Sequence, residues 1–197
     1  MRRPYRQRKS APFPWNGWYH CTVHTYGSWL RGDPRGWRTR HHREHVDGDY
    51  KNPPDEGTWE WLFAYSKRLM KRVAVTLDWT LRVFVLHAFV AKLLADGVEV
   101  LVASLDNRHL HVLARFPKAT PRYALGYAKK YATQQLKAHG LAVGLELKLG
   151  EGIWAKRSHP EPIADRAHEV FTFGYIRKHA KKGAVVWHYR MPRPTVA

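Results

Sequence analysis

The sequence contains little cysteine and no long hydrophobic run. Its single cysteine, Cys21, excludes a disulfide framework and a zinc site made of cysteines, and it fits a reducing cytoplasm. The most apolar stretch, residues 83–95, is interrupted by His87 and Lys92 and falls short of the roughly 18–20 residues that span a bilayer. The basic segment 1–9 has no apolar stretch behind it, so we expect no secretory signal. No basic amphipathic segment stands clear of the globular pattern either, so we expect no membrane partner.

Acidic residues are also scarce. The 197 residues include 16 Asp and Glu against 34 Lys and Arg, which gives a formal net charge of +18. Such an excess favours a polyanionic partner, because each phosphate that a basic side chain neutralises releases counterions. We interpret residues 1–14 as a flexible basic tail that helps to hold nucleic acid.

The length and composition favour one domain with its own core. Apolar residues make up 44% of the chain and aromatic residues 13%. We expect a single domain over residues 15–190, with an irregular insertion at about residues 28–75 and a short tail at 191–197.

The order of strand and helix patterns predicts an α+β sandwich. Alternating and β-branched residues indicate strands, and apolar residues three and four apart indicate helices. The pattern favours an antiparallel sheet with helices packed on one face. The expected strands are 18–26, 98–105, 109–116, 141–149, 153–163 and 184–189, and the expected helices are 59–72, 78–95, 120–139 and 164–183.

The segment His109-Leu110-His111 carries the chemistry of an expected hairpin strand. Side chains alternate along a strand, so the two imidazoles point one way while Leu110 and Val112 enter the core. With 13 histidines in the chain, ordinary surface histidines are the alternative. Two imidazoles on one strand face, directly after a tight turn, favour a metal-binding pair.

On the last expected helix, Tyr175 and His179 are four residues apart and share one side. His179 would complete a three-ligand site with His109 and His111, beside the phenol of Tyr175. Three protein ligands leave positions on a divalent ion open for phosphate oxygens. Tyr175 would attack phosphorus and form a covalent phosphotyrosine. The alternative is an amphipathic helix with a tyrosine at the edge of the core.

This pattern resembles the single-tyrosine HUH transposases, which include small insertion-sequence transposases and REP-associated tyrosine transposases. His109-Leu110-His111 is similar to the histidine pair of the family, and residues 175–179 are similar to its tyrosine helix. His179 stands where the family has its third metal ligand, which is commonly Gln or Asn. Residues 18–30 with 32–36 resemble the opening of one branch, so the resemblance covers most of the chain.

The resemblance implies a ferredoxin-like fold and an enzyme that nicks and rejoins single-stranded DNA, often beside a hairpin. It implies Mg²⁺ or Mn²⁺ as the cofactor and a 5′-phosphotyrosine intermediate. We expect such an enzyme to act in the bacterial cytoplasm at the nucleoid, as a monomer or as a homodimer that exchanges the tyrosine helix. The single suitable tyrosine separates the pattern from two-tyrosine replication initiators and relaxases.

Basic residues near these elements are candidates for binding DNA phosphates. Arg108 and Arg115 neighbour the histidine strand, and Lys178 and Lys182 lie on the polar side of the tyrosine helix. Solvated lysines are the alternative for the last two.

Other aromatic and histidine residues have plainer interpretations. For the stripe of Tyr123, Tyr127 and Tyr131 we favour core packing over base stacking. His20 and His24 share a strand face and could border the site, but structural filling is favoured. We interpret the histidines of the insertion as loop residues, and we leave the tryptophans open between packing and stacking; these are His41, His42 and His45, and Trp15, Trp18, Trp29 and Trp37.

A second class of function also fits the charge. A non-catalytic basic nucleic-acid-binding domain would bind in a salt-sensitive way without forming a metal-dependent adduct. A domesticated relative that keeps the site but is no longer mobile remains open as well.

Overall fold

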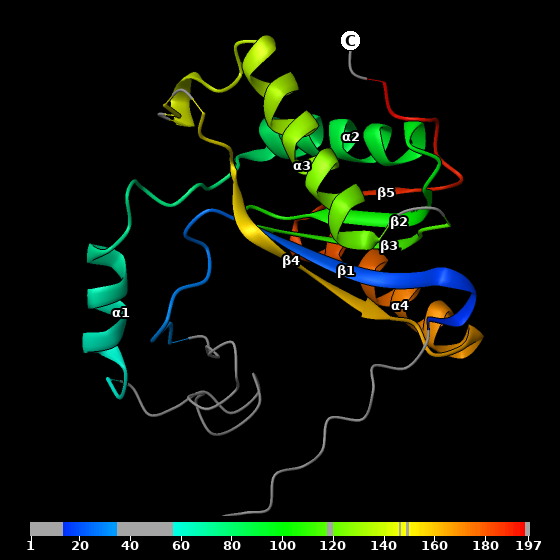
Figure 1. Ribbon diagram of the computed structural model, residues 1–197, viewed down its shortest axis with the longest axis horizontal. Helices are drawn as coiled ribbons and strands as arrows, with labels where there is room; N and C mark the ends of the chain where they lie inside the picture. The colour runs from blue at the N-terminus through cyan, green and yellow to red at the C-terminus, as the bar shows by residue number, and fades with distance from the viewer. Residues whose placement is uncertain (1–13, 35–56, 118–119, 146, 149, 196–197) are drawn as a thin grey trace, which may run out of the picture.

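A five-stranded antiparallel sheet, in the order β4-β1-β3-β2-β5, forms the centre of the molecule (Figure 1). The computed structural model describes residues 14–34, 57–117, 120–145, 147–148 and 150–195. The strands are β1 (Trp18–Thr25), β2 (Glu99–Leu105), β3 (His109–Arg115), β4 (Trp154–Pro162) and β5 (Val185–His188). The helices are α1 (Glu60–Arg68), α2 (Trp79–Ala95), α3 (Pro121–Ala138) and α4 (Arg166–Lys178).

The elements β1-α2-β2-β3-α3-β4 form a ferredoxin-like unit. Their strands lie in the order β4-β1-β3-β2, which is the order of a split β-α-β arrangement. β5 extends the sheet beside β2, and α1 lies in the connection between β1 and α2. The predicted α+β fold with an antiparallel sheet is therefore confirmed.

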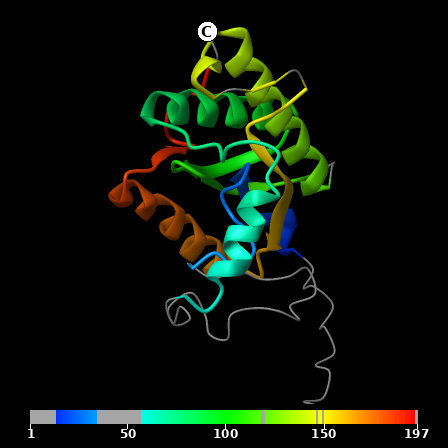
Figure 2. The same cartoon turned by 90° about the vertical axis from the view of Figure 1, so that its left-hand side faces the viewer.

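Helices cover both faces of the sheet rather than one (Figure 2). α2 and α3 pack on one face and bury the larger core, which includes Leu110 and Val112. α4 packs on the other face, where Ile176 lies in a smaller cluster with Val102 and Leu113. The expectation of one covered face holds for α2 and α3 but is wrong for α4. The reason is that Leu113 alternates with Val112 along β3 and gives the second face an apolar strip of its own.

Capping residues explain where the helices begin and end. The Asp78 side chain accepts a hydrogen bond from the Leu81 N–H at 2.8 Å at the start of α2, and Asp165 does the same for the His168 N–H at the start of α4. Gly97, with φ of 76°, ends α2. None of the helices in the described ranges is both long enough and apolar enough to cross a membrane.

The predicted strand over residues 141–149 is wrong for the residues that are described there. Val143–Leu145 form a single 3-10 turn instead. The chain turns at Gly140 and at Gly150, whose φ angles are 68° and 81°, and β4 already occupies the sheet edge beside β1. No free edge next to β1 is therefore left for this segment.

The described parts of the predicted insertion, residues 28–34 and 57–75, pack together. A Cβ atom at Gly32 would collide with the backbone of Trp59 and Phe63, so only glycine allows this close approach. The predicted helix over 59–72 is shorter than expected, since α1 ends at Arg68. Several predictions fall outside the described residues, namely those on residues 1–13, on Trp37 and on His41, His42 and His45.

Candidate metal and tyrosine site

β3 presents its two histidines on the face that α4 covers. Leu110, between them, is fully buried in the larger core on the other face. Opposite them on β1, Thr22 pairs with His111 and His24 pairs with His109. Directly opposite residues of an antiparallel pair lie on the same side of the sheet. The predicted alternation of β3 is confirmed, and β1 adds polar side chains to the same face.

α4 brings Tyr175 to these histidines, and His179 follows directly as the C-cap of α4 and the first residue of the 3-10 turn His179–Lys182, where the helix was predicted to continue to residue 183. Ile176 is fully buried and Thr172 nearly so, which fixes the side of the helix that faces the sheet. The ring centroid of Tyr175 lies 4.8 Å from that of His179 and 5.8 Å from that of His111. The Tyr175 side chain is 42% exposed, so solvent and a ligand can reach it.

The three candidate ligands, His109, His111 and His179, approach one another closely. The ring centroids of His111 lie 4.7 Å from those of His109 and of His179, and the latter two are 6.2 Å apart. Imidazoles that share one ion would have centroids about 5 Å apart, because each nitrogen lies about 2 Å from the metal. Within the described ranges, no three His, Cys, Asp or Glu side chains already form a closed ligand cluster. The residue types fit a metal site, but the three rings are not arranged around a common metal position.

Each of the three rings uses its Nδ1 atom for a contact within the protein. His109 Nδ1 lies 2.6 Å from Asp106 Oδ2, His111 Nδ1 lies 3.0 Å from His20 Nε2, and His179 Nδ1 lies 3.0 Å from Ser104 Oγ. When Nδ1–H donates to such a partner, the lone pair of the ring is on Nε2. Metal-binding histidines are commonly oriented in this way by an acceptor on the other nitrogen.

Sequence reasoning missed Ser104 and Asp106, which hold two of the rings, and for His20, which holds the third, it favoured structural filling over a place at the border of the site. His20 does not merely fill space, because its ring stacks on His111 at 5.1 Å and meets the edge of Tyr175 at 6.1 Å. The strand register would have revealed His20, since it shares the face of Thr22, the partner of His111. Asp106 belongs to the predicted turn, but nothing in the turn pattern showed that its carboxylate would reach a histidine ring.

The histidines nearest the sheet are held in their neutral form. Burial, opposed by Glu161, lowers the pKa of His20 to about 4. Burial, assisted by repulsion from neighbouring histidines, lowers the pKa of His111 to about 2. The pKa of His179 is lowered too, first by burial and then by the charges of His109 and Lys182. Neutral imidazoles are the form that binds metal ions.

Asp106 is held in its charged form beside His109. Burial alone would raise its pKa. Hydrogen bonds from the His109 ring and from the backbone N–H groups of Arg108 and His109 outweigh burial and lower the pKa of Asp106 to about 2. The His109 ring therefore has a permanent carboxylate acceptor for its Nδ1–H.

The four basic residues predicted to bind DNA are placed differently. Lys178 and Lys182 are exposed, next to or within one turn of His179. Arg108 directly precedes His109 and lines a groove beside α1. Arg115 stands at the other end of β3, about 20 Å from His109 for six residues of extended chain, and it forms an ion pair with Glu99. Arg115 therefore lies away from the histidines, and its contact with DNA stays a prediction.

The fold can be compared with known proteins. No protein-family model matches the sequence, and no curated protein matches it. Among solved structures, the fold is similar to that of a REP-associated tyrosine transposase bound to a REP hairpin, with a TM-score of 0.47 and 15% sequence identity. The match covers 91% of this chain and 74% of the other.

Proposed function

We propose that the protein is a metal-dependent enzyme that nicks and rejoins single-stranded DNA through Tyr175, as a single-tyrosine HUH transposase does. The observation that carries the proposal is the common arrangement of His109, His111 and His179. Each of the three rings has its Nδ1 atom within 3.0 Å of a protein partner, and the rings of His111 and His179 lie beside the ring of Tyr175. Unrelated surface histidines are not expected to share such Nδ1 contacts beside one tyrosine.

The three histidines would hold one divalent ion through Nε2. When bound, the ion would act as a Lewis acid on a phosphate oxygen and help to orient the scissile phosphodiester. Mg²⁺ prefers oxygen ligands and loses its water reluctantly, so of the two expected ions a site with three imidazoles favours Mn²⁺. Asp106, His20 and Ser104 would fix the orientation of the ligands.

Tyr175 would act as the nucleophile. Its oxygen forms a bond to phosphorus as the bond from phosphorus to the 3′ oxygen of the preceding nucleotide breaks. The phenol proton passes to solvent, and the leaving 3′ oxygen takes up a proton to become a hydroxyl. The products are a 5′-phosphotyrosine and a free 3′ end, and the reverse attack of a 3′ hydroxyl rejoins DNA. Lys178 and Lys182 would bind the phosphates on either side, and a hairpin next to the cleaved site would position the strand.

The test is the covalent adduct between the protein and a labelled single-stranded oligonucleotide in the presence of Mn²⁺. We expect the wild-type adduct to be located on Tyr175 by mass spectrometry, and to be lost in Tyr175→Phe while oligonucleotide binding persists. Tyr189→Phe is a matched control, because Tyr189 is 49% exposed and lies in the turn after β5.

Two results would contradict the proposal. An adduct that survives in Tyr175→Phe would mean that another residue is the nucleophile. Salt-sensitive binding by the wild-type protein without any adduct would favour the non-catalytic nucleic-acid-binding domain.

A further inference from the structure

Two tyrosines of α3 are exposed, although their stripe was expected to pack in the core. Tyr123 is 70% exposed and Tyr127 is 60% exposed, and only Tyr131 packs against the larger core. Residues four apart share one side of a helix, so the two rings lie next to each other on the solvent side of α3. The prediction of core packing is wrong for Tyr123 and Tyr127. Burial in the core therefore does not account for the presence of two aromatic rings at these positions.

The same side of α3 continues from the tyrosines into polar residues. Gly126, Lys130, Gln134 and Lys137 follow at intervals of three and four, and all are exposed. We call the six residues from Tyr123 to Lys137 on this side the α3 strip; it is about 21 Å long at the rise of a helix. Gly126 lowers the stability of a helix interior relative to alanine. No atom lies within 4 Å of the position that a Cβ atom would take there, so a ligand can approach the backbone.

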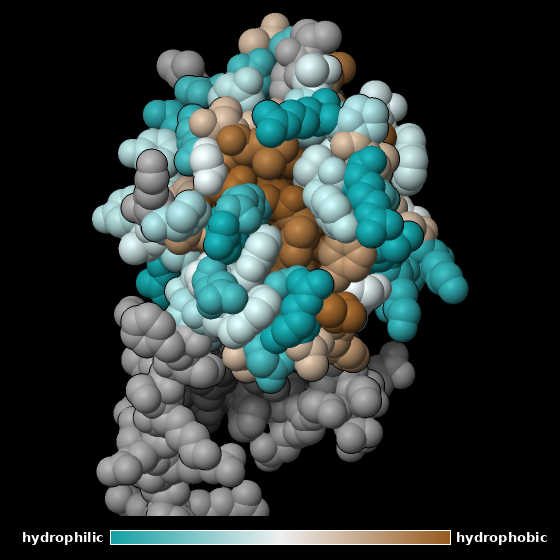
Figure 3. All heavy atoms as spheres, turned by 90° about the vertical axis from the view of Figure 1, so that its right-hand side faces the viewer, coloured by the Kyte–Doolittle hydropathy of each residue, from teal (hydrophilic) through white to brown (hydrophobic). Residues whose placement is uncertain are grey.

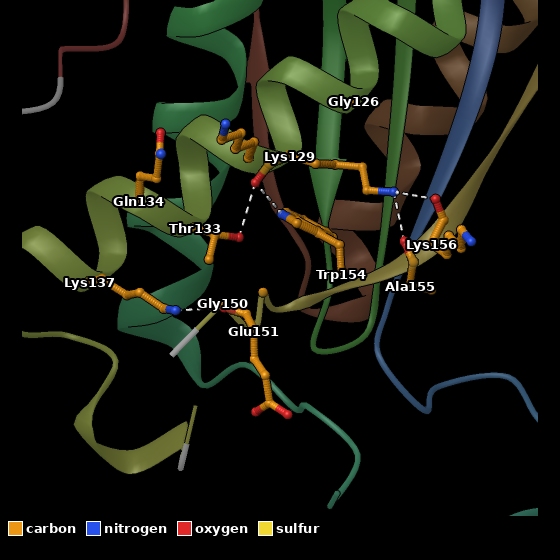
Figure 4. Close-up of a pocket in the computed structure, with 12 residues that line it drawn as sticks. Gly126, Lys129, Thr133, Gln134, Lys137, Gly150, Glu151, Trp154, Ala155 and Lys156 are labelled. Atoms are coloured by element: carbon orange, nitrogen blue, oxygen red, sulfur yellow. Dashed lines mark hydrogen bonds between the residues drawn. The ribbon is translucent and has the colours of Figure 1, made fainter. Parts of the chain in front are cut away.

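The second half of the α3 strip borders a groove of about 530 Å³ between α3 and the segment that leads into β4 (Figure 4). Lys130, Lys137 and Lys156 line it. Among the described residues that line the groove, Glu151 is the one with a carboxylate. Its Oε2 atom lies 3.7 Å from Nη1 of Arg72. The amines along the groove are therefore in excess over carboxylates, which favours an anionic ligand.

Lys129 holds the wall of this groove in place. Its nearly buried ammonium donates hydrogen bonds to the carbonyl oxygens of Ala155 at 2.7 Å and Lys156 at 3.3 Å (Figure 4). Trp154 donates through its ring N–H to the Lys129 carbonyl at 3.0 Å. These bonds fix β4 against α3, so the groove exists before any ligand binds.

The first half of the α3 strip borders a hollow near the end of α2. Val98 and Ala124 form its apolar floor together with both exposed tyrosines, and Lys92 and Asp96, which pair with each other at 2.6 Å, complete its lining. Figure 3 shows one face of the molecule, on which hydrophobic side chains are exposed between hydrophilic ones. Two rings beside an apolar floor offer stacking partners for flat, unpaired bases.

We propose that the α3 strip is a second nucleic-acid-binding surface that holds a single-stranded segment. Lys130, Lys137 and Lys156 bind its phosphates, and Tyr123 and Tyr127 stack on its bases. The strip lies on the sheet face opposite α4, so this segment is distinct from the part of the strand at Tyr175. The ligand class rests on the function proposed above, whereas the binding itself requires neither a metal nor cleavage.

The test uses the full chain with Tyr175→Phe, so that no adduct forms, and a fluorescent single-stranded oligonucleotide of mixed sequence. Anisotropy at several salt concentrations gives the affinity and its salt dependence. We expect Tyr123→Ala with Tyr127→Ala to weaken binding at least tenfold, and Tyr123→Phe with Tyr127→Phe to bind as tightly as the parent. We expect Lys130→Gln with Lys156→Gln to make the negative slope of log affinity against log salt less steep by about 1.4. This is about 0.7 for each lost phosphate contact on a single strand.

Trp79→Ala is the matched control for removal of an exposed ring. Trp79 is 56% exposed at the first residue of α2 and lies outside the α3 strip, so its loss should leave the affinity unchanged. Equal weakening by Trp79→Ala and by the double tyrosine variant would overturn the proposal, as would an unchanged affinity in the latter. Tighter binding of a duplex than of a single strand, with the same loss in the variants, would overturn the choice of a single-stranded ligand.

The results also separate this proposal from the proposed function. If the wild-type protein forms the adduct on Tyr175 and the α3 variants bind the oligonucleotide as tightly as the parent, only the proposal of a second surface is overturned. Weakened binding in the α3 variants without any adduct in the wild-type protein would support the second surface and contradict the enzyme.

Discussion

The two faces of the sheet differ in the side chains that they carry. The face under α2 and α3 carries a continuous apolar core, in which Leu110, Val112 and Phe89 are fully buried. The face under α4 has a small apolar cluster at one end and a group of histidines, a serine and an acid at the other. Burial of apolar area stabilises the first face, whereas hydrogen bonds organise the second.

This difference shows that stability and chemistry are divided between alternate residues of one strand. Along β3, even-numbered residues enter the core and odd-numbered ones face α4. Substitutions one position apart should therefore have effects of different kinds.

The largest expected difference is between Leu110→Ala and His109→Ala. Leu110→Ala leaves a cavity in the core and should lower the free energy of unfolding by about 2–5 kcal/mol. His109 is about one-third exposed, and His109→Ala should change the free energy of unfolding far less while it removes a ligand and lowers the affinity for Mn²⁺. Urea denaturation and calorimetric Mn²⁺ titration measure the two effects. If His109→Ala destabilised the fold as much as Leu110→Ala, the division between the faces would be wrong.

The second effect is a loss of stability in mild acid that comes from the α4 face. The pKa values of His20 and His111, about 4 and about 2 in the folded protein, lie below the ordinary value of 6.5. Below pH 6.5 the unfolded chain binds protons that the folded protein does not. The free energy of unfolding therefore rises with pH through this range and reaches its full value only above pH 6.5. Between pH 6.5 and 5.5 we expect a loss of about 2 kcal/mol for the two groups.

Urea denaturation at a series of pH values gives this profile, and His20→Gln should remove about half of the loss. A flat profile between pH 5.5 and 6.5 would show that both rings are accessible to protons in the folded protein. The prediction concerns the metal-free protein.

The smallest expected effect comes from His20, which contacts a candidate ligand without being one. His20→Ala removes the partner of His111 Nδ1, and partners of this kind contribute about 10-fold or more to metal affinity. We expect His20→Ala to weaken Mn²⁺ binding by about tenfold and His20→Gln, whose side-chain oxygen can accept the same hydrogen bond, to weaken it less. Equal affinity in the wild-type protein and in both variants would mean that His20 only packs.

The parts of the structure that local patterns determine could be predicted from the sequence. The Asp78 cap and Gly97 define α2 closely, and the alternation around Leu110 predicted the orientation of both histidines. The four-residue interval predicted that Tyr175 and His179 lie together, and their rings do so although α4 ends at Lys178 and His179 is its C-cap. In each case a helix or strand period is enough, and no distant contact has to be known.

The features that depend on which elements become neighbours could not be predicted. The contact of His20 with His111 depends on the register of β1 against β3. The exposure of Tyr123 depends on how α3 is rotated against α2, and the position of α4 on the second face depends on the closure of the whole sheet. Arg115 was assigned to the site from its nearness in sequence, but six residues of extended chain carry it to the other end of β3.

The position of Tyr175 on α4 and of His179 at the C-cap of the same helix couples two properties of the site. Their helix rests on the sheet through a small cluster around Ile176, while His109 and His111 belong to the rigid central strands. A shift of α4 away from the sheet would withdraw the nucleophile and one ligand together, and binding of the ion would draw both of them back. Binding of the metal ion and placement of the Tyr175 oxygen at the site would then be governed by one equilibrium, the position of α4 relative to the sheet.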